Sequence, residues 1–136
     1  MRKPVILGLR EGRRYALGKM EAVFKADGEE SADAYSVSEW WIEPGCTGVG
    51  AHSHEANDEI FFILEGKAEI LVADQWREVS AGGMVIIPAG VTHDFRNLSD
   101  ERAGLLNVFI PGGFEKNMPA IVDWFAEHGD SGKAEN

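Results

Sequence analysis

The chain has 136 residues, a single cysteine and a formal net charge of −10 at pH 7. This acidic balance, with no basic cluster, argues against a nucleic-acid partner, because binding to phosphates needs a basic patch. No apolar run is long enough to cross a bilayer and the N-terminus lacks a signal-peptide pattern, so no membrane partner is expected.

The length fits one domain with its own hydrophobic core, which we place at residues 1–129, followed by a polar, flexible tail at 130–136. A single cysteine excludes an internal disulfide and favours a reducing compartment, so the expected location is the cytoplasm. We interpret that residue, Cys46, as an inert small hydrophobe rather than a metal ligand.

The first third of the chain predicts β-structure. Residues 4–9 form a candidate edge strand, and residues 13–26 alternate apolar and polar side chains without helix caps, which favours a β-conformation. We expect a solvent-exposed loop at residues 27–33, since these acids lack the alternating oxygens of a calcium site. A strand at residues 34–43 carries Trp40 and Trp41 on opposite faces; either one borders a pocket or both belong to the core.

The next stretch contains two histidines and a glutamate at close spacing. His52 and His54 lie two residues apart, so that in a strand they project to the same face. Residues 55–58 predict a turn, after which Glu59 begins an apolar strand that ends at Leu64. Alternation places Glu59, Phe61 and Ile63 toward the interior, and Ile60, Phe62 and Leu64 toward a second layer formed by a sheet, a helix or another subunit.

Further strands are predicted at residues 67–72, 76–79, 84–87, 91–97 and 104–110. Between two of them, Pro88-Ala-Gly90 predicts a tight turn, because proline fixes φ and glycine permits positive φ. This turn leads to His93, while Asn97 is expected to brace a turn rather than to touch a substrate. Asn107 lies among apolar residues and is either satisfied in the core or directed into a pocket.

The last element is a helix at residues 115–128. Its apolar residues follow helical spacing, with Asn117 as the cap and Gly129 as the stop. We interpret His128, in its last turn, as a surface residue and not as a ligand. The apolar positions are Met118, Ile121, Val122 and Phe125.

Two imidazoles and a carboxylate that converge on one point suit a divalent transition metal, and His93 offers a fourth ligand. At these residues the sequence resembles the cupins. Their second motif, Gly-x5-Pro-x-Gly-x2-His-x3-Asn, fits from Gly82 to Asn97. Their first motif fits at His52, His54, Glu59 and Gly66, and departs only where Cys46 replaces a turn-forming glycine.

The resemblance covers residues 45–97 and implies an all-β fold, a single cupin barrel (a double-stranded β-helix or jelly roll) with a short C-terminal helix. It implies one divalent metal ion bound by His52, His54, Glu59 and His93. We expect iron or manganese, although zinc, nickel, cobalt and copper accept the same ligands.

The closing segment, residues 109–115, is similar to that of quercetin dioxygenase-like cupins. This similarity implies a dioxygenase-type oxidoreductase acting on a small enol or phenolic compound, with Glu59 as ligand and base. A lyase, isomerase or cyclase that consumes no O₂ and a non-catalytic cupin that binds a small molecule or a metal are the alternatives. The apolar outer set of residues 60, 62 and 64, with Trp76 and the N-terminal strand, suggests a homodimer.

Overall fold

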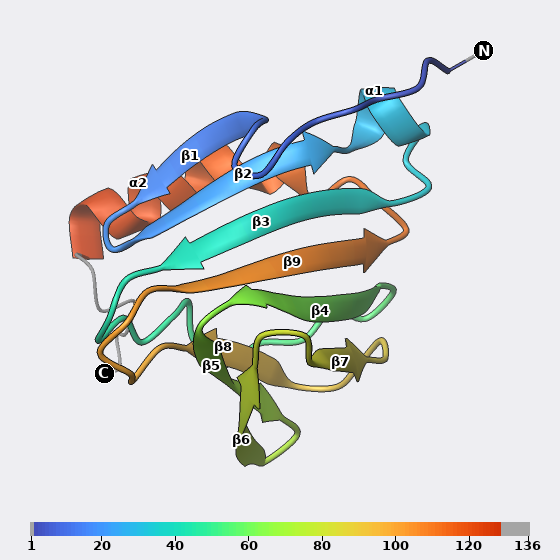
Figure 1. The fold of residues 1–136 in the computed structure, drawn as a ribbon. Helices are drawn as coiled ribbons and strands as arrows, with labels where there is room; N and C mark the ends of the chain where they lie inside the picture. The colour runs from blue at the N-terminus through green and yellow to red at the C-terminus, as the bar shows by residue number, and fades with distance from the viewer. Residues whose placement is uncertain (1, 129–136) are drawn as a thin grey trace.

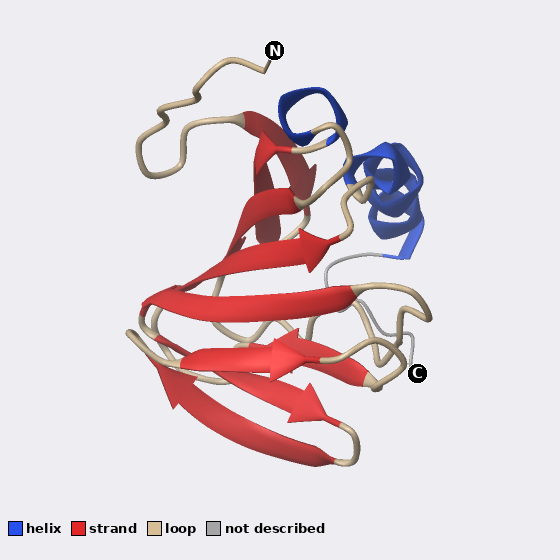
Figure 2. Ribbon diagram, turned by 90° about the vertical axis from the view of Figure 1, so that its right-hand side faces the viewer, coloured by secondary structure: helices blue, strands red, loops and turns tan. Residues whose placement is uncertain are grey.

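The computed structural model describes residues 2–128 and consists mainly of antiparallel strands in two sheets (Figure 1, Figure 2). The larger sheet has six strands in the order β1-β2-β3-β9-β4-β7, and the smaller has three in the order β6-β5-β8. The bounds are β1 Arg13–Leu17, β2 Met20–Ala26, β3 Ser36–Ile42, β4 Asp58–Glu65, β5 Lys67–Val72, β6 Gln75–Ser80, β7 Met84–Ile87, β8 His93–Arg96 and β9 Ala103–Ile110.

This arrangement confirms the predicted all-β jelly roll with a short C-terminal helix. The two sheets form a sandwich and are not joined edge to edge into one closed barrel. In Figure 1 the C-terminal helix lies against the β1–β2 end of the larger sheet, which is consistent with its contacts to β1. Within residues 2–128, neither helix is long and apolar enough to span a membrane.

Strands β4 and β9 are neighbours in the larger sheet and show the predicted alternation of faces. Glu59, Phe61 and Ile63 are buried on β4, whereas Phe62 between them is 38% exposed. Leu105 of β9, paired with Ile63, is also buried. Burying one such apolar side chain contributes roughly 1.5–3 kcal/mol, so the inward face is a main source of stability.

The N-terminal segment does not form the strand predicted at residues 4–9. It has no strand pairing, and Ile6 is 94% exposed. Carbonyl oxygens near its end are bound by a side chain instead, because Lys25 Nζ donates to Gly8 and Glu11 at 2.7 and 2.9 Å. The apolar residues of this segment remain exposed and pair with no strand, so the predicted strand is absent.

Residues 13–26, predicted as β, form a hairpin of two strands. Leu17 pairs with Met20 across a two-residue turn of Gly18 and Lys19. Gly18 has φ of +63°, a conformation that suits the first central position of a hairpin turn and that glycine adopts without strain.

The segment at residues 27–33 is not the solvent-exposed loop that we predicted. It contains a short helix, α1 (Gly28–Ser31), and Asp27 before it is only 3% exposed. The Glu30 carboxylate accepts the N–H of Asp27 at 2.9 Å, which is the reciprocal bond of a capping box. The Asp-x-x-Glu spacing of Asp27 and Glu30 was the sequence signal for this helix start.

The predicted C-terminal helix consists of a 3₁₀ turn, Glu115–Asn117, followed by α2, Met118–His128. Asn117, the predicted cap, ends the turn directly before the α-helix. Met118 and Phe125, two of the four apolar positions that the helical spacing predicted, are buried. The predicted stop at Gly129 and the tail at 130–136 lie outside the described residues.

Candidate metal centre

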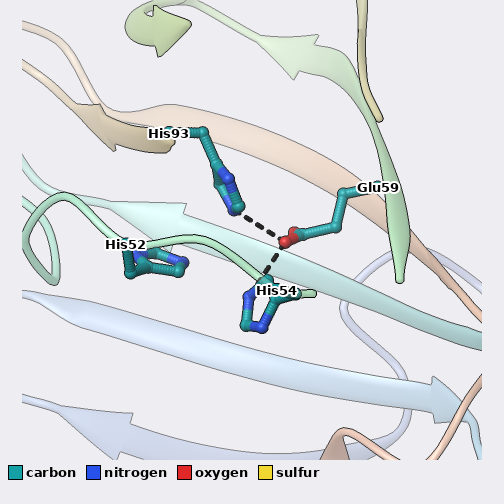
Figure 3. Close-up of side chains that lie close together, drawn as sticks. All are labelled: His52, His54, Glu59 and His93. Carbon is teal, nitrogen blue, oxygen red and sulfur yellow. Dashed lines mark ion pairs between the residues drawn. The ribbon is translucent and has the colours of Figure 1, made fainter. Parts of the chain in front are cut away.

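The four predicted ligands lie together between the sheets (Figure 3). His52, His54, Glu59 and His93 each offer one ligand atom, and these atoms all lie within 4.8 Å of one another. Glu59 is on β4, His93 begins β8, and the other two lie in the loop before β4. Metal bonds of about 2.0–2.3 Å place two ligand atoms of one ion within roughly 4.5 Å of each other. A small movement of these side chains toward one another would therefore bring all four within bonding distance of one ion.

The loop that carries two of the histidines is extended but is not a strand of either sheet. His52 forms an isolated bridge with His93, in which each N–H donates to the other residue's carbonyl oxygen at 3.0 and 2.8 Å. The carbonyl oxygen of His54 accepts the N–H of Gly90 at 2.9 Å. Both loop histidines are therefore fixed by the segment that leads to the third.

That segment begins with the tight turn predicted at Pro88-Ala-Gly90. The N–H of Val91 donates to the carbonyl oxygen of Pro88 at 3.2 Å, and Gly90 has φ of +88°, which confirms the turn. Gly48 has a similar role, because it has φ of +85° and a β-carbon there would collide with the carbonyl oxygen of Phe95. These residues shape the loops around the site and are not among the four ligands.

The Glu59 carboxylate lies at the centre of the group. Its Oε2 is 2.7 Å from His93 Nε2 and 3.1 Å from His54 Nε2 (Figure 3). Glu59 and His93 are buried, whereas His52 and His54 are partly exposed. The centre is therefore accessible from the side of the two loop histidines.

Backbone carbonyl groups orient two of the imidazoles. His52 Nδ1 lies 2.7 Å from the carbonyl oxygen of Gly50, and His93 Nδ1 lies 3.0 Å from that of Val91. A carbonyl oxygen only accepts, so Nδ1 of each ring carries the proton and Nε2 of the neutral ring presents a lone pair. Metal-binding histidines typically show this arrangement.

Two buried atoms at the centre, Glu59 Oε2 and His93 Nε2, find no hydrogen-bond partner among residues 2–128. They lie close together, and with the proton of His93 on Nδ1 both present lone pairs to the space between them. Buried polar atoms are normally satisfied, so a cation, either a proton or a metal ion, belongs there. The donor set and its orientation fit a divalent transition metal.

The protonation equilibria of these groups reflect the same proximity. Burial by itself would raise the pKa of Glu59, but the imidazoles of His54 and His93, when they carry a proton toward the carboxylate, outweigh this effect and lower it to about 2. Burial opposes protonation of His93, yet the nearby Glu59 carboxylate raises its pKa above the usual value. Burial lowers the pKa of His52, which therefore offers a neutral ring near pH 7.

Asn107 supports the glutamate from β9. Its Nδ2 donates to Glu59 Oε1 at 2.9 Å, and its side chain is buried. The sequence left two roles open for Asn107. The structure shows the first one: its side chain is satisfied in the interior by its bond to the central carboxylate. This bond holds one oxygen of Glu59 and directs the other toward the histidines.

Asp94, which follows His93 on β8, is buried and fixes the loop that leads to the histidines. Burial raises the pKa of Asp94 to about 6, although the backbone N–H groups of Phe95, Gly50 and Val49 partly offset this effect by donating to it.

Aromatic rings and an apolar cavity adjoin the exposed side of the centre. The His54 ring packs edge-on against Phe109 and Phe114, with centroid distances of 4.9 and 6.0 Å. Beyond it lies a cavity of about 480 Å³ between the loop histidines and α2. A cavity of this size can hold a small organic molecule.

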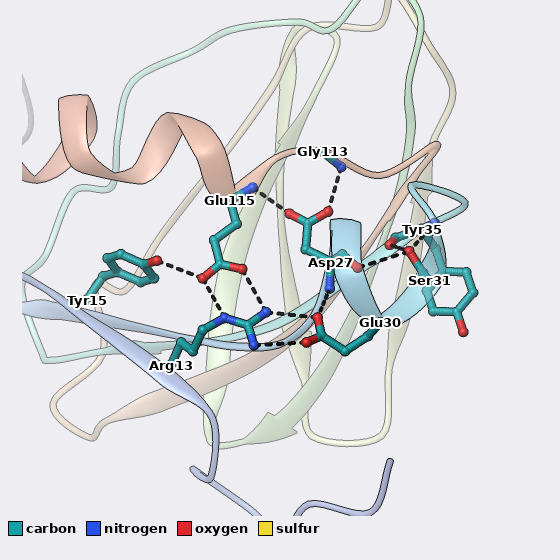
Figure 4. Close-up of polar contacts among 8 residues, drawn as sticks. All are labelled: Arg13, Tyr15, Asp27, Glu30, Ser31, Tyr35, Gly113 and Glu115. Atoms are coloured by element: carbon teal, nitrogen blue, oxygen red, sulfur yellow. Dashed lines mark hydrogen bonds and ion pairs between the residues drawn. The ribbon is translucent and has the colours of Figure 1, made fainter. Parts of the chain in front are cut away.

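A polar network fixes the segment that begins this wall (Figure 4). The carboxylate of Asp27 accepts the N–H groups of Gly113 and Glu115, both at 2.6 Å. The Glu115 carboxylate in turn accepts two bonds of 2.8 Å from Arg13 and one of 2.7 Å from the Tyr15 hydroxyl. The 3₁₀ turn that precedes α2 is thereby tied to β1 and to the residue before α1.

Both tryptophans of β3 are buried. Trp40 lies in the core, with its ring 5.8 Å from that of Phe95. Trp41 points to the opposite side, where Arg10 and Arg102 stack on it at 5.0 and 4.9 Å. Neither lines the cavity beside the loop histidines, so the interpretation of both as buried packing residues is the better one.

Three other residues that the sequence analysis discussed lie outside the ligand group. Asn97 is buried and donates to the carbonyl oxygens of Ile42 and Glu101, which confirms its bracing role. Cys46 packs in the hydrophobic core and is not one of the four grouped ligands. His128 is exposed and stacks on a tryptophan of α2, which confirms it as a surface residue outside the ligand group.

The wall formed by Phe114 and α2 and the network that fixes it were not predicted from the sequence. The Asp-x-x-Glu spacing at Asp27 was a readable signal for part of that network. The contact between Arg13 and Glu115 had none, because the two residues are far apart in the sequence.

A sequence profile described as the cupin domain matches residues 38–109, which is more than half of the chain and includes all four grouped ligands. This chain belongs to the cupin family. The matched segment ends before Phe114 and α2, so one wall of the cavity lies outside the part of this cupin that the profile describes.

An uncharacterized protein from Streptomyces coelicolor is 34% identical over 76 residues, which are 56% of this cupin and 70% of that protein. The solved structure of KdgF from Halomonas sp. has a TM-score of 0.71 and 16% identity, and the likeness covers 84% of this cupin and 99% of that chain. A predicted oxalate decarboxylase from Thermotoga maritima has a TM-score of 0.69 and 21% identity, with coverage of 80% and 99%. These two likenesses establish the fold alone.

Proposed function

We propose that this cupin is a metal-dependent oxidoreductase of the dioxygenase type that acts on a small enol or phenolic compound. The observation that carries the proposal is the pair Glu59 Oε2 and His93 Nε2, which are buried, 2.7 Å apart and without a hydrogen-bond partner among residues 2–128. With His52 and His54 beside them, these atoms suit one divalent ion. The adjoining apolar cavity suits an unsaturated or aromatic substrate.

His52, His54, Glu59 and His93 are the residues that would hold the ion. We expect iron or manganese, and zinc, nickel, cobalt and copper are compatible with the same ligands. When bound, an ion of this kind polarises a substrate oxygen and supports electron exchange with dioxygen.

Glu59 is the candidate base. Asn107 donates to its Oε1, while its Oε2 lies 3.1 Å from Nε2 of His54, the loop histidine on the accessible side of the centre. A carboxylate in this position suits the hydroxyl protons of enols and phenols, which are more acidic than those of alcohols.

In the proposed reaction a carbon–carbon double bond breaks and both atoms of one O₂ molecule enter the product, so no external reductant is consumed. In the alternative, a lyase, isomerase or cyclase, Glu59 moves a proton next to a carbonyl group without O₂. In the third case the protein binds a small molecule without turnover.

The test is oxygen uptake by protein loaded anaerobically with iron(II) or manganese(II), using flavonols, catechols and 1,3-diketones as substrates. We expect one O₂ consumed per substrate lost, and a Glu59→Gln variant that loses turnover more than metal affinity. Substrate loss without oxygen uptake would favour the non-oxidative enzyme. No turnover of any compound by the fully loaded protein would favour the binding module.

A second, independent proposal concerns the partner, which we expect to be another copy of this chain. On the outer side of the larger sheet, Ile60 lies between Val108 and Ile86, and Phe62 pairs with Met84. Met84 and Ile86 are more than half exposed. Two copies that pair these rows would bury them, and two-fold pairing is the commonest assembly.

Trp76, which we had grouped with this surface, lies on β6 of the smaller sheet, where the guanidinium of Arg96 stacks on its ring at 3.7 Å. The apolar rows of β4 and β7 alone therefore define the surface to be tested. Light scattering should give the mass of a dimer, and Ile86→Glu should give a monomer. A wild-type monomer at micromolar concentration would contradict the dimer.

A further inference from the structure

The cavity beside the loop histidines is built from two different parts of the chain. One side is the loop of residues 49–54, which ends in two of the grouped ligands, and the other is the segment from Phe114 through α2. Its volume is about 480 Å³. The lining residues of the α2 side are Phe114, Asn117, Ala120, Ile121, Trp124 and Phe125.

The lining of this cavity carries little charge. Among residues 2–128, no Lys, Arg, Asp or Glu side chain lines it, and its polar side chains are His52, His54 and Asn117. A compact dianion such as oxalate would find no Lys or Arg side chain here to neutralise it. An uncharged or weakly acidic molecule with an apolar body would lose little hydration and would gain aromatic contacts.

The wall opposite the ligands is held in a fixed position. Phe114 stacks on Phe24 of the core at 6.2 Å and packs edge-on against Phe109 at 5.0 Å. On either side of Phe114, the N–H groups of Gly113 and Glu115 are bound by one carboxylate (Figure 4). A preformed apolar wall selects by shape, because it need not be ordered when the ligand binds.

From this arrangement we infer that α2 and Phe114 form the site for the non-reacting part of the substrate, and that they select a small aromatic, weakly acidic molecule whose oxygens face His52 and His54. The inference rests on the proposed function, because it takes the grouped ligands as the reacting end. It goes further by assigning selectivity to residues outside the segment 38–109 that matches the cupin profile.

Catechol and oxalate test this inference, because both present two adjacent oxygens to an ion but only catechol has an aromatic ring. Calorimetry with the zinc-loaded protein avoids redox chemistry, since zinc is redox-inert. We expect catechol to bind at least tenfold more tightly than oxalate. Ala120→Glu, which places a charge in the cavity, should weaken catechol binding at least tenfold and leave zinc affinity unchanged.

Ala126→Glu is the matched control, because Ala126 is also an exposed alanine of α2 but does not line the cavity. It should bind catechol as the wild type does, and melting temperatures of both variants will show that they are folded. Equal affinities for catechol and oxalate, or an Ala120→Glu variant that binds catechol like the wild type, would overturn the inference.

Zinc binding is measured first, so that failure of the metal centre is recognised separately. In that case, saturation transfer from the metal-free protein to the ring protons of catechol reports on the cavity alone. Transfer that is lost in Ala120→Glu and kept in Ala126→Glu would support the cavity assignment without the metal. Absence of transfer to the wild type would overturn it.

Discussion

Two buried carboxylates in this protein have opposite surroundings. Both oxygens of Asp27 accept backbone N–H groups, those of Gly113 and Glu115, at 2.6 Å. Glu59 has one oxygen bonded by Asn107, while the other lies against imidazole nitrogens without a hydrogen-bond partner among residues 2–128. A carboxylate whose oxygens are all satisfied holds the fold together, whereas one with an unsatisfied oxygen is available to a ligand.

Glu59→Gln should have the largest effect, and it acts on the metal-bound state. A neutral amide is a poor ligand, so we expect metal affinity to fall at least a hundredfold by calorimetry. In the wild type, metal at a hundred times its dissociation constant should raise the free energy of unfolding by about 2.7 kcal/mol, and the same concentration should stabilise the variant by about 0.4 kcal/mol at most. Equal stabilisation of both proteins would show that Glu59 is not a ligand.

Asp27→Asn should have the next largest effect, and it acts with or without metal. The new NH₂ group faces a backbone N–H where the carboxylate had accepted one, so we expect the free energy of unfolding in urea to fall by about 2 kcal/mol. The stabilisation by metal should remain. A variant of unchanged stability, or one that loses metal binding while folded, would contradict the distinction between the two carboxylates.

Asn107→Leu tests whether the hydrogen bond to Oε1 of Glu59 is needed to orient Oε2 toward a bound ion. Removing the donor to Oε1 leaves the carboxylate less firmly oriented, and partners of this kind affect metal affinity by about 10–100-fold, so we expect a loss near the lower limit. Competition with a chromophoric chelator measures it. Unchanged affinity would mean that the neighbouring histidines alone orient Glu59.

Glu115→Gln should have the smallest effect, and its effect depends on pH. Burial by itself would raise the pKa of Glu115, but bonds from Arg13 and Tyr15 outweigh it and lower the pKa below the usual value. The ionised Glu115 therefore stabilises the fold fully at pH values above the ordinary pKa of a glutamate. This contribution is lost as the pH falls through the lower pKa that Glu115 has in the folded protein. The variant should lose about 1 kcal/mol at pH 7 and progressively less at lower pH in urea titrations. A pH-independent difference would contradict this assignment.

Much of the sheet could be predicted from the sequence because strand alternation and turns depend on short spacings, whereas the grouping of all four ligands was implied by the resemblance to the cupins. Alternation along β4 determines that Glu59 points inward with Phe61, and the turn at Pro88 brings His93 beside the loop histidines. The metal itself remains a prediction.

What the sequence did not reveal depends on contacts between distant residues. Arg13 and Glu115 meet only because β1 and α2 pack together, and no periodicity encodes that contact. The strand predicted at residues 4–9 was wrong for a related reason. A short apolar run indicates a need for cover, but it does not specify which segment supplies it.

The position of α2 after the ligand-bearing strands has a consequence for how such a protein can change. The last of the four residues suited to bind an ion is His93. The wall that we assign to substrate recognition begins later in the chain, at Phe114, and continues into an 11-residue helix. Mutations in that helix can alter which compounds are admitted and leave the ion-binding residues untouched. A graft of this one helix between related proteins would then transfer substrate preference as a module.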